Sequence, residues 1–413
     1  MASNSILVIG GGFAGLTAAL EAAEIGHEVF IIEKTPFLGG RVMQLNKYFP
    51  KLCPPSCGLE IQYQRIKNNP GVKFFTLAEV VKVEGSVGNY EVTVRIKPRY
   101  AGPSSPDLSE LCEGLSTEVT NDFEFGLSTR KPVYMDAPFA FPQRYVVDKA
   151  NLSEADKNKV QKCDYLDLTE EEKIITLTVG SIIIATGWKP YDVTNLSNLG
   201  AGVVKNCISN MQMERLASPY GPTNGAILRP SDGRSPKKIA FVQCAGSRDE
   251  NHLHYCSYIC CMASLKQAQY VREQYPEAEV TIYYIDLRTP GRYDNFAQKI
   301  LADEKIFAVK GKVAAVAQDN AGDDVWVTVE DAVSCTKSVE RFDLVVLATG
   351  MQPSLAGASL PLDVPVDAEG FIVGGEEKGI FAAGCAKQPL DVMKSAQSAT
   401  GAAMKAIQTV RGR

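Results

Sequence analysis

The chain has 413 residues, of which 45% are hydrophobic, and a formal net charge of −5. This length allows two or three domains with large cores, and the charge gives no reason to expect binding to nucleic acid or to lipid headgroups. The longest apolar runs are strand-sized, so we expect no direct insertion into a membrane. The N-terminal apolar run leads straight into glycines and has no basic segment, which argues against a signal peptide and for a cytoplasmic protein. In that compartment the eleven cysteines favour metal binding or catalysis over structural disulfides.

The first thirty-odd residues have the pattern of a dinucleotide-binding unit. Residues 6–9 predict a buried strand, and residues 16–23 a helix that follows a run of glycines. Residues 27–33 predict a second strand, which ends in the acid Glu33. Strand, glycines, helix, strand and terminal acid at this spacing are far more specific than a glycine motif alone.

Three glycines in this turn have separate expected tasks. Gly10 permits the tight turn, Gly12 lets the backbone close on a pyrophosphate, and Gly15 allows close packing of helix on strand. Glu33 can accept hydrogen bonds from both ribose hydroxyls of the nucleotide. The other candidates for contact with the cofactor in this region are Phe13, Ala14 and Lys34.

Further along the chain, several motifs are typical of FAD-binding proteins with two dinucleotide-binding domains. One is the loop Gly39-Gly40-Arg41 with Val42, where the arginine can meet a phosphate. Two strand patterns ending in Ala-Thr-Gly, at 181–187 and 344–350, mark crossings between the FAD domain and an inserted domain; the first adds Ala185, Thr186 and Gly187 to the candidates. The segment 379–384 resembles the C-terminal FAD motif, in which the residue after Gly384 is usually Asp but is here Cys385.

We therefore predict an α/β flavoprotein with an FAD-binding Rossmann-type domain and an inserted, thioredoxin-reductase-like βαβ domain. The expected FAD-domain segments are 1–97, 171–230 and 344–413. Residues 231–343 are expected to form the second domain, and residues 98–170 an insert.

The second domain carries cysteines where a nicotinamide dinucleotide would need glycines. Its pattern is a strand at 238–242, a cysteine-rich turn, a helix at 263–274 and a strand at 280–285. Cys244, Cys256, Cys260 and Cys261 supply the four thiolates that an iron–sulfur cubane needs, although their spacing is not that of a ferredoxin. A zinc site, with His252 or His254 replacing one thiolate, is an alternative. Buried cysteines that only fill the core are another.

The segment from Cys244 to Cys261 and its flanks resemble the core of the heterodisulfide reductase A subunits, flavin and iron–sulfur proteins of methanogens and sulfur-metabolising anaerobes. The loop around Arg41 and the Gly384-Cys385-Ala386 segment are similar to the same family. The resemblance implies FAD and a [4Fe–4S] cluster on the four cysteines. It also implies an oxidoreductase that relays electrons. We identify no acid–base pair or nucleophile in the sequence, which agrees with electron relay.

The insert at 98–170 resembles the scaffold of that family's ferredoxin-like insert but keeps only Cys112 and Cys163. Within the family, a chain without ferredoxin clusters is most similar to the A subunits of quinone-interacting membrane-bound oxidoreductase complexes in sulfate-reducing bacteria. That resemblance implies three partners: an iron–sulfur/flavin subunit, adenylylsulfate reductase and a quinone-reactive membrane subunit. It also implies a cytoplasmic location at the inner membrane, held there by the partner subunits.

Cys53 and Cys57 lie about a dozen residues after the Gly39-Gly40-Arg41 loop. They are either a dithiol that exchanges electrons with FAD or ligands shared with another chain, or turn cysteines without chemistry. Two further alternatives stay open for the whole protein. It is a soluble NAD(P)H or disulfide oxidoreductase, or a non-catalytic FAD-bearing scaffold for electron-transfer subunits.

Overall fold

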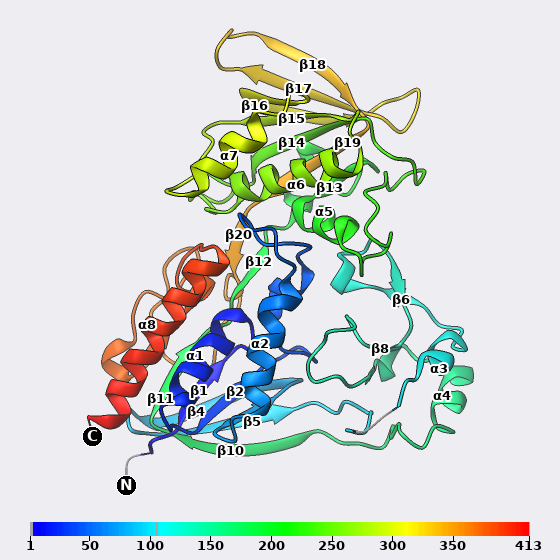
Figure 1. Cartoon of the computed structure of the whole chain (residues 1–413). Coiled ribbons are helices and arrows are strands. Elements are labelled where there is room, and N and C mark those ends of the chain that lie inside the picture. The colour runs from blue at the N-terminus through cyan, green and yellow to red at the C-terminus, as the bar shows by residue number, and fades with distance from the viewer. Residues whose placement is uncertain (1–2, 104–105, 413) are drawn as a thin grey trace. The chain divides into compact units, whose positions relative to one another are not determined.

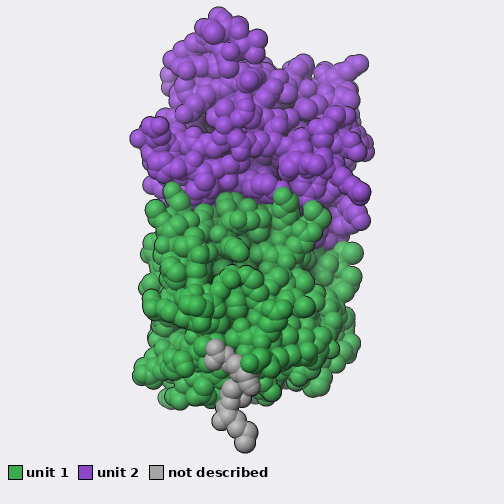
Figure 2. Space-filling model, turned by 90° about the vertical axis from the view of Figure 1, so that its left-hand side faces the viewer, with its two compact units in different colours: residues 1–43, 55–188, 353–413 green, residues 44–54, 189–352 purple. Residues whose placement is uncertain are grey.

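The computed structural model describes residues 3–103 and 106–412, and it divides into two compact units. Unit 1 contains residues 1–43, 55–188 and 353–413, and unit 2 contains residues 44–54 and 189–352 (Figure 2). Two short strands, β12 (Trp188–Pro190) and β20 (Met351–Pro353), pair with each other where the chain passes from one unit to the other.

Unit 1 is built on a parallel sheet with the strand order β21–β11–β1–β2–β3. Its strands are β1 (Ile6–Ile9), β2 (Val29–Ile32), β3 (Val72–Phe75), β11 (Ser181–Ile184) and β21 (Ile380–Ala382). Helices α1 (Phe13–Glu24) and α8 (Val392–Arg411) lie side by side against this sheet, and α2 (Pro55–Lys67) packs next to α1 (Figure 1). Strands β1, β2 and β11 are fully buried, which is why they read as unbroken apolar runs in the sequence.

An antiparallel sheet forms a second layer of unit 1. Its strands are β4 (Ala78–Ser86), β5 (Asn89–Ile96) and β10 (Lys173–Val179), in the order β10–β5–β4. Leu7 and Ile9 of β1 share a core with Val92 and Val94 of β5. Because side chains alternate along a strand, Val8 faces the other way, close to the position that a side chain on Gly15 of α1 would take.

The segment between β5 and β10 has a small core of its own. Its elements are α3 (Ser109–Glu113), β6 (Val119–Thr120), β7 (Thr129–Arg130), β8 (Val133–Tyr134), β9 (Val146–Val147) and α4 (Glu154–Val160). Leu115, Val133 and Val160 are buried in this core, against which Cys112 and Cys163 also pack. The segment is therefore folded around apolar side chains.

A buried carboxylate ties two ends of this segment together. The side chain of Asp156 accepts hydrogen bonds from the backbone N–H groups of Ser116 and Thr117 at 2.9 and 2.8 Å, and from the Ser116 hydroxyl at 3.1 Å. Burial alone raises the pKa of Asp156, but the hydrogen bonds outweigh it and hold the pKa well below its usual value.

We expect Asp156→Asn to destabilise this segment by about 1–3 kcal/mol, because an amide cannot accept the full set of hydrogen bonds. In the native protein this stabilisation is present above the unfolded carboxyl pKa, ~4, and is lost as the pH falls toward the depressed folded pKa. Limited proteolysis between residues 98 and 170 at pH 7 and at pH 2 measures both effects. Equal cleavage rates for the variant and the native protein at pH 7 would contradict the expected role.

Unit 2 is built on a seven-stranded sheet with the order β13–β19–β14–β15–β16–β17–β18. Its strands are β13 (Cys207–Ser209), β14 (Lys238–Ala245), β15 (Glu279–Tyr284), β16 (Ile306–Gln318), β17 (Val325–Asp331), β18 (Lys337–Phe342) and β19 (Leu344–Thr349). Its helices are α5 (Asn210–Ala217), α6 (Cys260–Gln274) and α7 (Tyr293–Leu301). The strands from β13 to β16 pair in parallel, whereas β16, β17 and β18 form an antiparallel extension.

The two-domain α/β fold is confirmed, and the predicted strand at 6–9 coincides with β1. Strand β11 covers the first four residues of the strand pattern predicted at 181–187. The boundaries of unit 2 lie elsewhere than the expected 231–343. Residues 189–230 and 344–352 belong to unit 2 because β13 pairs with β19, and β19 with β14, in its sheet.

The segment 44–54 belongs to unit 2 because a buried ion pair holds it there. The Glu214 carboxylate of α5 accepts from Lys266 Nζ of α6 at 2.9 Å and from the backbone N–H of Asn46 at 2.9 Å. Lys266 also donates to the Lys47 carbonyl at 2.6 Å.

A helix that crosses a bilayer needs about 20 predominantly apolar residues. In residues 3–103 and 106–412, no helix is both long and apolar enough to cross a membrane.

Candidate functional site

The glycine turn after β1 is shaped by close contacts that leave one glycine open. Gly10 has φ +107°, and a Cβ there would lie 2.3 Å from the Ala185 carbonyl oxygen. A Cβ on Gly15 would lie 1.9 Å from the Gly10 carbonyl oxygen, so that position sets the distance between helix and strand. Gly12, at the N-terminus of α1, is different, because its Cβ would meet only the Cα of Gly40 at 3.8 Å. The structure thus has open space at Gly12, where the sequence predicts the pyrophosphate.

Glu33 lies at the end of β2 and is buried. One carboxylate oxygen accepts from the Gly11 backbone N–H at 2.6 Å, and the other accepts from the backbone N–H and the hydroxyl of Thr35, both at 2.8 Å. A carboxylate has about four acceptor sites, so these bonds leave capacity for ribose hydroxyls. The sequence did not reveal Thr35 or Gly11 as partners. Lys34, by contrast, is exposed.

The Gly39-Gly40-Arg41 loop lies against the glycine turn. Gly39 pairs with Gly12 as a parallel bridge, and its backbone N–H donates to the Gly11 carbonyl at 2.8 Å. Arg41 follows in a short 3-10 helix, donates to the Trp188 carbonyl at 3.3 Å and stands 5.8 Å from the centre of the Phe125 ring. Burial lowers the pKa of Arg41, but an arginine stays charged at neutral pH.

The end of β11 adds an unsatisfied polar group to this site. Ala185 and Thr186 lie next to Gly10, and Gly187 has φ +70°. The Thr186 hydroxyl is buried and has no hydrogen-bond partner. Buried hydroxyls without a partner are costly, so this group fits a site that a polar ligand completes.

The last candidate segment reaches the same site from the C-terminal part of the chain. Gly384 has φ +61°, and a Cβ there would lie 2.8 Å from the Ala14 Cβ. Its backbone N–H donates to the Ser398 hydroxyl of α8 at 3.1 Å. Cys385 is buried, lies 3.4 Å from the Leu390 carbonyl and 3.7 Å from the Ser395 hydroxyl, and has a pKa raised by burial. Its thiol is therefore protonated at neutral pH.

These residues fit FAD. Four segments distant in sequence meet at the carboxyl ends of β1, β2, β11 and β21, where open parallel sheets bind nucleotides. Such a site offers an anion the N-terminus of α1 and the charge of Arg41. Bound FAD would supply two-electron chemistry that can be divided into single-electron steps. Thr186 was among the residues predicted from the sequence. Thr35, Ser398 and Phe125 were missed, because Ser398 and Phe125 depend on tertiary contacts and no motif marks Thr35 as a partner of Glu33.

In unit 2 the four predicted cysteines come together at the carboxyl ends of strands. Cys244 lies near the end of β14, and Cys260 and Cys261 are the first two residues of α6. The Cys260 thiol lies 3.7 Å from the carbonyl of Thr349, the last residue of β19. Cys256 stands in the intervening loop, and its sulfur accepts from the Tyr258 backbone N–H at 3.4 Å.

The thiols lie close enough together for their ionisation to be linked. Burial raises the pKa of Cys244 to about 11, and the nearby Cys261 and Cys256 also act to raise it. Cys260 has a pKa well above the usual value because of burial first, and then because of Cys244, Cys261 and Cys256. Metal binding at these thiols must therefore displace protons.

The donor set fits an iron–sulfur cluster in ligand type, in number and in its place at the N-terminus of α6, which favours thiolates. Bound there, a cluster would supply single-electron transfer. In the described part of the chain, no group of three or more His, Cys, Asp or Glu side chains is already arranged to hold a metal ion, so the thiols supply the type and number of ligands and not a preformed site. His252 is hydrogen bonded to the Tyr191 hydroxyl at 2.9 Å, and His254 is exposed.

The other cysteine candidates lie elsewhere. Cys53 and Cys57 are both exposed, and they belong to different units of the chain. Cys112 and Cys163 lie in the insert, where burial raises the pKa of Cys112 to about 11 and Cys163 is one of the smaller contributions. These two thiols are neighbours packed on an apolar core.

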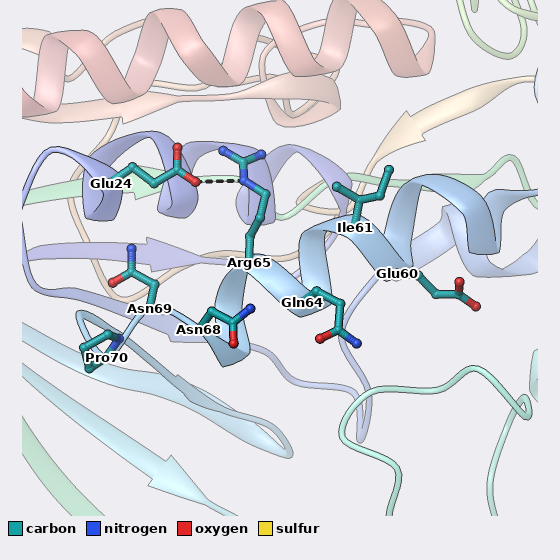
Figure 3. Close-up of a pocket in the computed structure, with 8 residues that line it drawn as sticks. All are labelled: Glu24, Glu60, Ile61, Gln64, Arg65, Asn68, Asn69 and Pro70. Atoms are coloured by element: carbon teal, nitrogen blue, oxygen red, sulfur yellow. Dashed lines mark hydrogen bonds and ion pairs between the residues drawn. The ribbon is translucent and has the colours of Figure 1, made fainter.

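A hollow on unit 1 is separate from the FAD candidates. Figure 3 shows it lined by residues of α1, of α2 and of the turn after α2: Glu24, Glu60, Ile61, Gln64, Arg65, Asn68, Asn69 and Pro70. Glu24 is the last residue of α1 and pairs with Arg65 at 2.8 Å. A helix of 12 residues is about 18 Å long, so this hollow lies at the opposite end of α1 from Gly12.

Comparison with known proteins agrees with this geometry. Residues 5–48 match the family model described as FAD dependent oxidoreductase. The chain is 36% identical to the second CoB–CoM heterodisulfide reductase iron-sulfur A subunit of Methanopyrus kandleri, over 98% of this chain and 64% of that protein. It is 36% identical to the corresponding iron-sulfur A subunit of Methanocaldococcus jannaschii, over 97% of this chain and 63% of that protein. The chain thus spans somewhat less than two thirds of the length of these relatives.

Solved structures share the fold. Thioredoxin reductase from T. acidophilum matches with a TM-score of 0.53 at 15% identity, with 99% of each chain covered. Thioredoxin reductase from Lactococcus lactis matches with a TM-score of 0.54 at 14% identity, with 100% of each chain covered. The chain therefore shares the fold of these thioredoxin reductases, its residues 5–48 match the FAD dependent oxidoreductase model, and its sequence is similar to those of the heterodisulfide reductase A subunits.

Proposed function

We propose that this chain is an electron-transfer subunit that holds FAD in unit 1 and one [4Fe–4S] cluster on Cys244, Cys256, Cys260 and Cys261 in unit 2. The observation that carries the proposal is the meeting of four thiols at the strand ends of unit 2, where a related reductase would bind a nicotinamide dinucleotide. The chain exchanges two electrons at the flavin and one at a time at the cluster.

A cluster is favoured over zinc by the similarity to relatives that are named as iron-sulfur subunits. Four thiolates by themselves suit either metal. Elemental analysis separates the two, because a zinc site would give zinc and no iron.

Within the wider assembly we place this chain between a cytoplasmic reductase and a quinone-reactive membrane subunit. The relatives are named as subunits, which supports further electron-transfer subunits as partners. An insert that lacks the cluster cysteines resembles that of the quinone-interacting complexes, and this resemblance supports adenylylsulfate reductase as the acceptor or donor in sulfate reduction. In this arrangement the chain is cytoplasmic, and its partners hold it at the inner membrane.

Titration with reductant under anaerobic conditions tests the proposal. Because FAD takes two electrons and the cluster one, we expect purified protein to consume about three electrons per chain from dithionite. We expect NADH and NADPH to leave the flavin oxidised over the same period, because the turn after β14 carries cysteines in place of glycines.

Other outcomes identify the alternatives. About two electrons per chain, with FAD but neither iron nor labile sulfide, would identify a scaffold without a cluster. Bleaching of the flavin by NADH within seconds would identify a soluble NAD(P)H reductase instead. Reduction by a dithiol substrate in place of NADH would indicate a disulfide oxidoreductase that uses Cys53 and Cys57.

A further inference from the structure

We propose that Arg248 sets the reduction potential of the cluster by placing its guanidinium beside the Cys244 sulfur, with Asp286 holding it in position. This inference rests on the proposed cluster, and it assigns a role to a residue outside the four ligands. Hydrogen bonds and charge at the ligand sulfurs are among the factors that set cluster potentials.

The side chain of Arg248 is held between a thiol and a carboxylate. Its Nη2 donates to Asp286 Oδ2 at 2.8 Å, and the guanidinium also interacts with the Cys244 thiol. Asp286 follows the end of β15, and Cys244 lies near the end of the neighbouring strand β14. Asp286 therefore holds the guanidinium next to the thiols, because the Cys261 thiol lies 3.5 Å from the Asp286 carbonyl oxygen.

A second observation is that Nη1 of Arg248 is buried without a hydrogen-bond partner of standard geometry. A guanidinium has five N–H groups in a rigid fork, and a buried N–H without an acceptor is costly. A sulfide or thiolate sulfur of a bound cluster would be an acceptor at this place.

The backbone around the cysteines is strained, and hydrogen bonds hold the strained loop in place. Cys244, Arg248 and Tyr258 have φ values of +57°, +56° and +69°, which residues with a side chain rarely adopt. The Arg248 backbone N–H donates to the Tyr255 carbonyl at 3.1 Å, so the strained loop is fixed by hydrogen bonds. Strain of this kind clusters at functional sites, where the surrounding structure maintains it.

Arg248 is the arginine that acts on Cys244, whereas Arg288 acts more strongly than Arg248 on Cys261. The side chain of Arg248 is 23% exposed and that of Arg288 is 50% exposed. Solvent therefore screens the charge of Arg248 less than that of Arg288. Reduction adds one negative charge to the cluster, and a fixed positive charge stabilises that reduced state.

The test is the midpoint potential of the cluster in anaerobically purified full-length protein, followed by electron paramagnetic resonance. We expect Arg248→Gln to shift the midpoint to more negative values, and Arg248→Lys, which keeps the charge, to restore most of the shift. Arg234→Gln is the matched control, because Arg234 is 81% exposed and its ion pair is with Asp232. We expect it to leave the midpoint where it is in the native protein.

Iron and sulfide content separates this inference from the proposed function. If the native protein contains no iron, the proposed cluster itself is contradicted. Native protein with iron, and an Arg248→Gln midpoint equal to that of Arg234→Gln, would overturn only the role of Arg248. If Arg248→Gln purifies without iron, Arg248→Lys decides. Iron with a native midpoint in that variant supports the role of the charge, and loss of iron there as well contradicts it.

Discussion

Cys256→Ala is expected to lower the iron content of anaerobically purified protein from about four atoms per chain to three or fewer, with a matching loss of labile sulfide. The physical reason is that a cubane needs four ligands, and the other thiols of unit 2 do not replace this one. Cys256 stands in the loop between β14 and α6 and is half-buried. Its removal should therefore leave the fold and the FAD content unchanged.

Cys335→Ala is the control for this experiment. Cys335 is an exposed cysteine of the same unit, in the turn between β17 and β18, and its loss should not alter iron or sulfide. Iron content equal to that of the native protein in Cys256→Ala would contradict the ligand assignment. A fall in iron in both variants would point to general damage by the substitution or by oxygen.

Part of this site could be predicted from the sequence, because local patterns determine it. Strand, turn and helix follow one another around both Gly12 and Cys244, so the predicted residues needed only the standard βαβ geometry to reach the strand ends. Ala185 lies next to Gly10 because β11 pairs in parallel with β1.

The rest depended on contacts between segments far apart in the chain. The sequence carries no sign that Glu214 and Lys266 bury an ion pair that holds residues 44–54 on unit 2, and so Cys53 was assigned with the flavin loop. Thr186 was predicted as a contact of the cofactor, but only the structure shows that its hydroxyl is buried without a hydrogen-bond partner. The sequence does not show that Arg248 contacts Cys244 and Asp286, and its expected role depends on those contacts.

Gly12→Ala is expected to weaken FAD binding while leaving the stability of the apoprotein almost unchanged. Gly12 has φ −74° and ψ −179°, which alanine adopts without strain, and a Cβ there would meet only the Gly40 Cα at 3.8 Å. The stability of the apoprotein should therefore change by less than about 1 kcal/mol. The added methyl group would occupy the space expected for the pyrophosphate, so FAD affinity should fall at least tenfold, or about 1.4 kcal/mol.

Fluorescence titration of apoprotein with FAD measures the affinity, and urea unfolding of the same apoprotein measures the stability. Gly401→Ala is the matched control, because this glycine lies in the exposed part of α8 with no atom near its Cβ position. It should bind FAD as the native protein does. Gly10→Ala should lower both the stability of the apoprotein and the FAD affinity, unlike Gly12→Ala. Its Cβ would overlap the Ala185 carbonyl, and its φ is +107°. Native FAD affinity in Gly12→Ala would mean that the pyrophosphate does not approach this turn, since a methyl group in its path would have to weaken binding.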